Sequence, residues 1–169
     1  MRDSEGFDEF YLACYQRLVG QVAAVVGDLG DAEDAVQEAF VRASRHWSRI
    51  RAYDLPLAWV RRVAFREALS GLRRRRRRLA LLVRLGPPPA VPELSADGVD
   101  MHRAMARLPL RQRQVLVLFY VAELPVEDIA AQLRVPAGTV KSRLARGRAA
   151  LAGMLDGRDP AQAKETHHG

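Results

Sequence analysis

The segment from Leu108 to Leu151, LPLRQRQVLVLFYVAELPVEDIAAQLRVPAGTVKSRLARGRAAL, decides the fold of the C-terminal part of the chain. It predicts three short helices, of which the last two form a helix-turn-helix. On a helical wheel, one face of the last helix carries small and apolar residues, namely Val140, Leu144, Gly147 and Leu151. The opposite face carries polar and cationic residues, namely Thr139, Ser142, Arg143 and Arg146. One face is therefore expected to pack against the protein, and the other is available to read DNA.

The preceding helix is the expected packing partner. It should span about residues 126 to 133, with Ile129 and Leu133 one turn apart on its apolar face. Pro125 suits the first helical position, because the N–H that proline lacks would be unpaired there. The four residues Arg134 to Ala137 form a turn of the length that helix-turn-helix units use. The start of the last helix can then reach base edges in a major groove, although an ordinary helical hairpin with a solvated polar face is an alternative.

The string EDIAAQLRVPAGTVKSRLARGRAAL closely resembles region four of bacterial sigma factors of the extracytoplasmic-function type, above all in I-A-x-x-L and T-V-K-S-R-L-x-R-x-R. Two residues depart from the family pattern, which usually has Gly in place of Arg134 and a capping Ser or Thr in place of Pro136. Losing such a cap costs about 1 kcal/mol. The resemblance implies binding of the promoter upstream element through Thr139, Lys141, Ser142, Arg143 and Arg146. Output domains of luxR-like response regulators are similar in sequence, so this half alone leaves the family open.

The composition indicates a folded, all-α protein with a polyanionic partner. The 169 residues suffice for one or two small domains, 49% of them are apolar, and the helical periodicity is strong. The net charge of +7 comes from 27 basic residues, of which only Lys141 and Lys164 are lysines. Arginine binds phosphate and guanine bidentately, but a G+C-rich genome also favours arginine codons. The distribution of charge is therefore better evidence than the count.

The charges fall into blocks along the chain. Residues 1–60 carry a net charge of −4, residues 61–86 carry +9, residues 87–100 carry −3 and residues 101–157 carry +5, and the remainder is neutral. An acidic head followed by two basic blocks predicts one surface that binds protein and two that bind nucleic acid.

Several other classes of protein are disfavoured. Cys14 is the only cysteine, which excludes an intrachain disulfide and a thiolate metal site. No N-terminal segment has the pattern of a signal peptide, and no apolar run approaches the roughly 18 residues of a membrane span. We expect a cytoplasmic protein with no membrane partner, metal, cofactor or small-molecule substrate.

The N-terminal part begins with two expected amphipathic helices. Apolar residues recur at three- and four-residue steps from Phe7 to Val26. Asp31 is the expected N-cap of a second helix that runs to about Ile50, with a core stripe of Ala32, Val36, Ala39, Phe40, Ala43 and Trp47. The far side of this helix is mostly polar and consists of Asp34, Gln37, Glu38, Val41 and Arg45. Solvation and the helix dipole alone can explain acids near a helix start.

The string DAEDAVQEAFVRA in this second helix resembles region two of the same sigma factors, where the corresponding helix docks on the clamp helices of RNA polymerase. The family pattern D-A-E-D-x-x-Q-E-x-F is matched by Asp31, Asp34, Gln37, Glu38 and Phe40. Phe40 lies on the core stripe and is assigned to packing. The resemblance implies a polymerase-binding surface formed by Asp34, Gln37, Glu38 and Val41. Its acidic character suits a protein partner, because DNA would be repelled.

A third helix is expected from about Pro56 through AWVRRVAFREALSGLRRRRRR. One of its faces carries a basic stripe formed by Arg62, Arg66 and Arg73. The resemblance implies that this stripe contacts the promoter minus-ten element and the melted strand, in a kind of site that combines cations with pockets for flipped bases. Trp59 and Phe65 are the nearby aromatic residues, although such residues at helical spacing more often pack in a core. The family commonly has Asn and Asp at Arg66 and Ser70, so no minus-ten preference is inferred.

The arginine run from Arg73 to Arg78 allows three interpretations, namely a helix end, a phosphate clamp or a disordered charged segment. Residues 79–100 are expected to form a fairly stiff linker because they contain Pro87, Pro88, Pro89 and Pro92. The predicted organisation is a region-two domain over residues 7–78, this linker, a region-four domain over residues 101–155 and a disordered tail over residues 156–169.

The two resemblances occur in the family's order and cover about residues 7 to 152. The chain is thus similar to an alternative sigma factor of the extracytoplasmic-function type, and within it to the actinobacterial SigE-like group. The resemblance implies core RNA polymerase, promoter DNA and an anti-sigma factor as partners, and no enzymatic activity. A stand-alone helix-turn-helix transcriptional regulator is the second hypothesis. A nuclease would need its acids to converge on one ion, and those available spread around the helix: Asp31, Glu33, Asp34 and Glu38.

Overall fold

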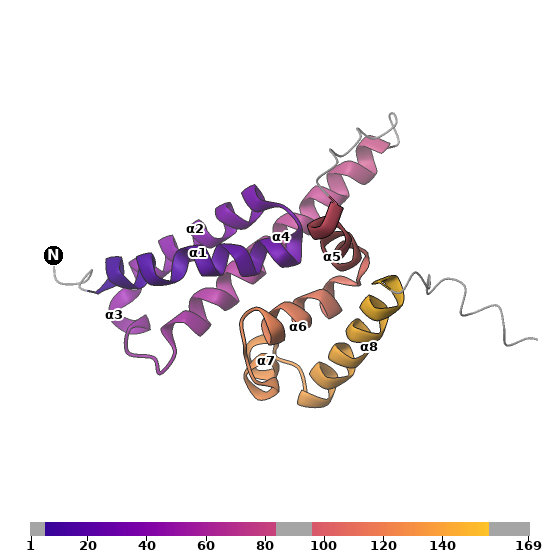
Figure 1. Ribbon diagram of the computed structural model, residues 1–169. Helices are drawn as coiled ribbons and strands as arrows, with labels where there is room; N and C mark the ends of the chain where they lie inside the picture. Colours follow the sequence, from indigo (N-terminus) through magenta and orange to yellow (C-terminus); the bar gives the residue numbers. More distant parts are fainter. Residues whose placement is uncertain (1–5, 84–95, 156–169) are drawn as a thin grey trace, which may run out of the picture. The chain divides into compact units, whose positions relative to one another are not determined.

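A computed structural model describes residues 6–83 and 96–155, and every regular element within these ranges is a helix (Figure 1). The chain divides into two compact units, Met1–Pro92 and Glu93–Gly169. The predicted all-α class and two-unit organisation are therefore confirmed. None of the helices in the described ranges is both long and apolar enough to cross a membrane.

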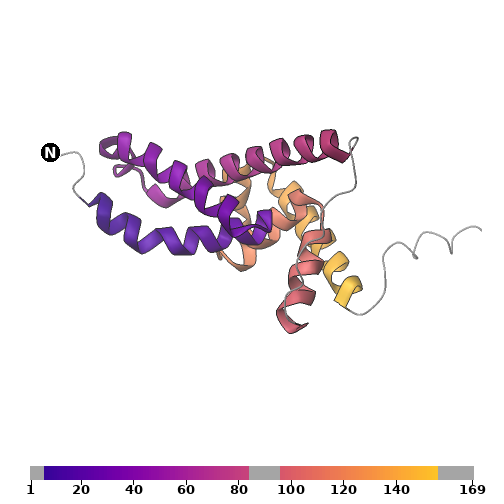
Figure 2. The same ribbon diagram turned by 90° about the horizontal axis from the view of Figure 1, so that it is seen from above.

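The first unit contains α1 (Phe7–Val26), α2 (Leu29–Arg45), α3 (Trp47–Ile50) and α4 (Pro56–Val83). α2 packs against both α1 and α4, and the two views show these three long helices side by side (Figures 1 and 2). Each contributes completely buried side chains to the core, among them Val22, Val36 and Val60. Aromatic rings fill one end, where Phe40 lies 5.0 Å from Tyr11 and Trp47 lies 5.0 Å from Phe10 between ring centroids. The core stripe predicted for the second helix is confirmed.

The connection between α1 and α2 corrects one prediction. Gly27 closes α1 with a φ of 80°, a left-handed conformation that glycine adopts without steric cost. The N-cap of α2 is Asp28 and not Asp31, because the Asp28 carboxylate accepts a 2.9 Å hydrogen bond from the N–H of Asp31. Asp28 has the extended backbone of a capping residue, whereas Asp31 already lies inside the helix. α2 also ends earlier than predicted, at Arg45, and α3 follows as a separate turn.

α4 begins at Pro56 as predicted but continues to Val83, through the arginine run and beyond residue 78. Arginine and leucine favour helix, and no proline interrupts the segment after Pro56. The arginine run is therefore helical. α5 (Ala96–Arg107) likewise begins within the segment expected to be a linker. The four prolines of that linker and the predicted tail, residues 156–169, lie outside the described residues.

The second unit contains α5, α6 (Leu110–Tyr120), α7 (Val126–Leu133) and α8 (Ala137–Leu155). α8 packs against the other three, and its predicted packing face is buried at Val140, Leu144 and Gly147 but only half-buried at Leu151. Gly147 permits the closest approach, because a Cβ atom there would lie 2.9 Å from Cδ1 of Leu116. The three helices predicted within residues 108–151 are confirmed, together with the bounds of α7.

The two turns that flank α7 differ from expectation. Pro125 is the N-cap and not the first helical residue, since its ψ of 157° is extended. At the other end Arg134 has φ 54° and ψ 49°, the left-handed region, which costs a residue with a side chain about 1–2 kcal/mol. α8 nevertheless starts directly after Pro136, whose carbonyl accepts the N–H of Thr139 at 2.9 Å. The absent Ser or Thr cap therefore does not delay this helix.

Candidate nucleic-acid and protein-binding surfaces

The outer face of α2 presents the residues that the sequence assigned to a protein partner. All four are exposed, namely Asp34, Gln37, Glu38 and Val41. Phe40 is only 2% exposed, which confirms its assignment to packing. Asp34 and Glu38 also line a groove of about 240 Å³ between α2 and α4, together with Glu67 and Arg74. The face thus combines carboxylates with one exposed apolar side chain, Val41.

An ion-pair network partly neutralises this face and joins it to α4. The guanidinium of Arg42 lies 2.7 Å from Oε1 of Glu38 and 2.9 Å from Oε1 of Glu67. Arg66 lies at the edge of the network, 3.9 Å from Glu67. Glu38 is therefore held in place by a cation, whereas Asp34 has no ion-pair partner among the described residues. Sequence reasoning missed Arg42 and Glu67, although the four-residue spacing of Glu38 and Arg42 is a recognisable signal.

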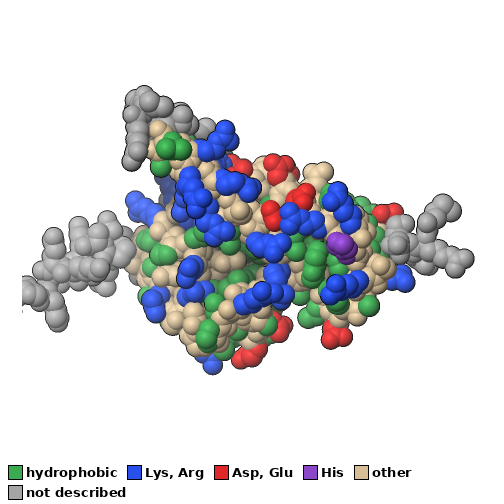
Figure 3. Space-filling view, turned by 180° about the vertical axis from the view of Figure 1, so that it is seen from behind, with side chains coloured by type: hydrophobic (Ala, Val, Ile, Leu, Met, Phe, Trp, Pro, Cys, Tyr) green, Lys and Arg blue, Asp and Glu red, His purple; other side chains and the backbone are tan. Residues whose placement is uncertain are grey.

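The predicted basic stripe of α4 is present on its surface. Its three residues are exposed, namely Arg62, Arg66 and Arg73. Figure 3 shows Lys and Arg side chains gathered along the projecting end of this helix. Every side chain from Arg73 to Leu81 is exposed. This end of α4 can therefore offer several guanidinium groups to a polyanion.

Two other arginines of α4 are turned toward the protein. Arg75 lies 2.8 Å from a carboxylate oxygen of Asp31 and 3.2 Å from one of Asp28, so it ties the arginine run to the start of α2. The N–H of Asp31 and then Arg75 hold the pKa of the Asp28 carboxyl below its usual range. Arg61 is 5% exposed and donates to Oε1 of Gln21 at 3.1 Å. Burial lowers the pKa of this guanidinium, followed by the nearby charge of Arg17.

Of the two aromatic residues assigned to α4, only one reaches the surface. Phe65 is 2% exposed and belongs to the core. Trp59 is half-buried and lines a hollow of about 150 Å³ together with His46, Arg49, Ile50 and Tyr53. This lining offers two aromatic faces, an imidazole and a guanidinium. The sequence did not indicate the other members, because they come from α3 and the residues that flank it.

The outward face of α8 carries the residues expected to read DNA. Lys141 and Arg146 are exposed, and the remaining three are half-exposed, namely Thr139, Ser142 and Arg143. The Ser142 hydroxyl donates to the carbonyl of Thr139 at 3.0 Å. Partial burial and then the charges of Arg111 and Arg146 lower the pKa of Arg143. Arg111, an exposed residue of α6, therefore adds to this cationic surface although the sequence did not single it out.

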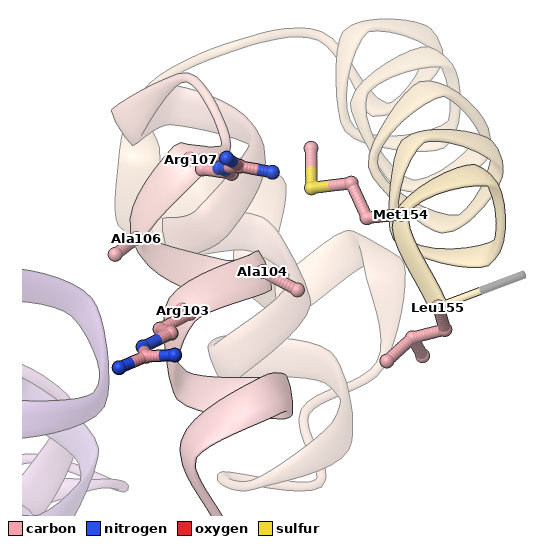
Figure 4. A pocket seen from close by; sticks show the side chains of 6 residues that line it. All are labelled: Arg103, Ala104, Ala106, Arg107, Met154 and Leu155. Carbon is pink, nitrogen blue, oxygen red and sulfur yellow. The ribbon is translucent and has the colours of Figure 1, made fainter. Parts of the chain in front are cut away.

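The second unit also has a hollow of about 530 Å³ between α5 and the end of α8, lined by Arg103, Ala104, Ala106, Arg107, Met154 and Leu155. Figure 4 shows the side chains of Arg107 and Met154 extending toward one another across it. The described part of the lining combines cations with apolar groups. Sequence reasoning missed it, since its two walls lie about 50 residues apart in the chain and meet only through the packing of α5 on α8. Within the described residues of the chain, no cluster of His, Cys, Asp and Glu is arranged to hold a metal ion.

Comparison with known proteins finds relatives along nearly the whole chain. Residues 10–78 match the family Sigma-70 region 2, and residues 99–151 match Sigma-70, region 4. The chain is 32% identical over 155 residues to the ECF RNA polymerase sigma factor SigM of Mycobacterium tuberculosis, covering 90% of this chain and 79% of that protein. It is 31% identical over 161 residues to the RNA polymerase sigma-E factor of Streptomyces avermitilis, covering 90% and 87% respectively.

Two solved structures share the fold. One is the sigma factor RpoE in complex with the anti-sigma factor NepR from Bartonella quintana, with a TM-score of 0.71, 24% identity and coverage of 89% of this chain and 96% of that chain. The other is CnrH in complex with the cytosolic domain of CnrY, with a TM-score of 0.64, 24% identity and coverage of 90% and 89%.

Proposed function

The chain belongs to the extracytoplasmic-function sigma factors, non-enzymatic proteins that bind core RNA polymerase and direct promoter-specific transcription initiation, and from this premise we propose how its surfaces divide that work. The first unit binds the polymerase and the minus-ten region, and the second unit reads the upstream element. We assign these roles to the regions predicted from the sequence, residues 7–78 extended along α4 and residues 101–155.

The outer face of α2 is the proposed polymerase-binding surface. Its contacts are Asp34, Gln37, Glu38 and Val41. Exposure of all four side chains on one helix supports this role, as does the carboxylate-lined groove beside them. A carboxylate surface is repelled by DNA but complements a basic protein surface. The ion pair with Arg42 restrains the Glu38 side chain, so that Glu38 loses less conformational entropy on binding.

The basic stripe of α4 is the proposed minus-ten surface, with Arg62, Arg66 and Arg73 binding phosphates of the opened strand. The hollow beside Trp59 supports the same role, because an unstacked base can stack on an aromatic face there. Phe65 has no part in this contact, since it is buried in the core.

The outward face of α8 is the proposed upstream-element reader, through Thr139, Lys141, Ser142, Arg143 and Arg146. The observation that carries this assignment is the exposure of Lys141 and Arg146, neither of which forms an ion pair with a described residue. Exposed cations with no acidic partner among the described residues are available to phosphates and guanine edges.

The location and control of the protein follow from the same premise. We assign it to the cytoplasm, where bacterial RNA polymerase acts. We also propose that an anti-sigma factor holds it inactive. The two fold relatives support this, because RpoE was solved with the anti-sigma factor NepR and CnrH with the cytosolic domain of CnrY.

Two double variants test this division of labour. Arg143→Ala with Arg146→Ala should weaken binding of the assembled holoenzyme to its promoter by about 10- to 100-fold, since each guanine or phosphate contact contributes about 1 kcal/mol or more. Core polymerase binding, measured by fluorescence anisotropy with labelled sigma factor, should stay within twofold. Asp34→Ala with Glu38→Ala should weaken core polymerase binding and leave promoter binding of the assembled holoenzyme within twofold.

Control variants remove charges of the same sign elsewhere. Arg148→Ala lies on another side of α8, and Asp8→Ala with Glu9→Ala removes two exposed acids from α1. Both controls should behave as the parent protein. Equal loss of polymerase and promoter binding in either test variant would contradict the assignment.

A further inference from the structure

Two residues with side chains adopt a left-handed backbone, and they flank the first helix of the helix-turn-helix. Glu123 and Arg134 both have a φ of 54°, whereas the other described positions with positive φ are glycines, Gly6 and Gly27. Backbone strain of this kind persists only where something compensates it, and it is concentrated at functional positions. Of the two, Arg134 lies nearer to the start of α8, and a functional role of its side chain would account for its strain.

The backbone of Arg134 accounts for the turn but not for the arginine. The N–H groups of Arg134 and Val135 both bond to the carbonyl of Ala130, the latter at 3.1 Å, and this closes α7. Glycine would supply the same two bonds without a steric penalty. The turn itself therefore does not require an arginine at this position.

The Arg134 side chain is not held by a polar contact with the described part of the protein. It is exposed, and no hydrogen bond or ion pair joins it to a described residue. The strain is therefore not offset within the described part of the protein. Arg134 lies in the short turn directly before Ala137, where α8 begins. A long cation at this turn is close in sequence to the face of α8 that begins with Thr139.

We propose that Arg134 is a phosphate-binding residue of the second unit, which contacts the DNA backbone beside the groove read by α8. This inference rests on the proposed DNA-reading role of α8. Guanidinium binds phosphate through two parallel hydrogen bonds. Such a contact positions the helix in the groove and carries no sequence information. The strain of Arg134 is thus offset by phosphate binding, which occurs only in the complex with DNA.

The test is a substitution whose effects on stability and binding have opposite signs. Arg134→Gly should raise the melting temperature of the full-length chain by about 2 °C, because it relieves the left-handed strain. The same variant, assembled with core RNA polymerase on a promoter fragment that the parent transcribes, should bind DNA about threefold to tenfold more weakly. The slope of log affinity against log potassium chloride concentration should fall by about 0.9, as for one lost phosphate contact.

Two further variants separate the guanidinium from the strain. Glu123→Gly relieves the same strain at the other end of α7, and should raise the melting temperature without weakening DNA binding. Arg134→Lys keeps the charge and should retain the salt slope. Unchanged affinity and slope in Arg134→Gly would overturn the proposal, as would an equal loss of affinity in Glu123→Gly.

The same promoter-binding assay also tests the DNA-reading role of α8. If Arg143→Ala with Arg146→Ala also leaves promoter binding unchanged, the DNA-reading face of α8 is wrong and the role of Arg134 fails with it. If that double variant loses binding and Arg134→Gly does not, only the inference on Arg134 fails.

Discussion

The two units use arginine in opposite ways. In the first unit, Arg42 is paired with Glu38 and Glu67, and Arg75 with Asp28 and Asp31. In the second unit, no ion pair joins two described side chains between residues 101 and 155. Arg42 and Arg75 therefore join helices of the first unit, whereas an exposed cation of α8 such as Arg146 has no ion-pair partner among the described residues and remains available to an external anion.

The units also differ in how their helices begin and end. The first unit uses Gly27 to close α1 and the carboxylate of Asp28 to cap α2. The second unit closes α7 with a strained Arg134, and both α6 and α7 follow prolines that make no side-chain capping bond. The first unit thus gains stability from charge and capping at its turns, and the second depends more on packing. We expect pH and salt to act mainly on the first unit, and changes of core volume to act strongly on the second.

The largest effect should come from the close packing of Gly147 against Leu116 in the second unit. Gly147→Leu inserts a side chain where a Cβ atom alone would lie 2.9 Å from Cδ1 and 3.2 Å from Cγ of Leu116. Such overpacking should lower the free energy of unfolding by about 2–3 kcal/mol, measured by calorimetry. Gly138→Leu in the same helix is the matched control, because nothing lies within 4 Å of a Cβ there. Equal melting temperatures for the two variants would mean that packing does not dominate this unit.

The cap of α2 should give a smaller, pH-dependent effect. Asp28→Ala removes the oxygen that accepts from Asp31 and should cost about 1 kcal/mol at pH 7. Because the pKa of Asp28 is lowered on folding, its charge stabilises the protein fully above the unfolded-state value of about 3.9, and this contribution is lost as pH falls through the folded-state pKa.

Asp28→Asn separates the cap from its charge. Asparagine caps nearly as well, so this variant should lose only a few tenths of a kcal/mol at pH 7. The melting-temperature difference between parent and Asp28→Asn should shrink between pH 5 and pH 2. A constant difference across this range would exclude a charge contribution from Asp28.

The exposed ion pair that holds the arginine run should contribute less than the cap of α2. A double-mutant cycle of Arg75→Ala and Asp31→Ala should give a coupling of about 0.5 kcal/mol in low salt, typical of a surface pair. The coupling should disappear in 1 M sodium chloride, because salt screens exposed charges. A cycle of Arg75 with the exposed acid Glu33 should show no coupling in either condition. Equal coupling for Glu33 and Asp31 would show that the observed pairing is not selective.

Much of the fold followed from local patterns. The sequence predicted the bounds of α1 and α7, the start of α4 and the packing face of α8 correctly. Helical periodicity depends only on residues that are close in sequence. The candidate binding residues of α2, α4 and α8 are exposed or half-exposed, as the helical wheels predicted. Their binding roles stay predictions, since exposure shows only that a partner can reach them.

The sequence by itself therefore determined the helices, their faces and the segregation of charge between α2, α4 and α8. Tertiary structure alone decided which charged side chains find partners within the protein. Arg75 meets Asp31 across 44 residues and Arg61 meets Gln21 across 40. The helical wheel separates these two arginines from the stripe of Arg62 and Arg73, but it does not reveal their partners. The reason is physical: a helical wheel depends only on residues a few positions apart, whereas an ion pair requires two distant helices to pack in one register.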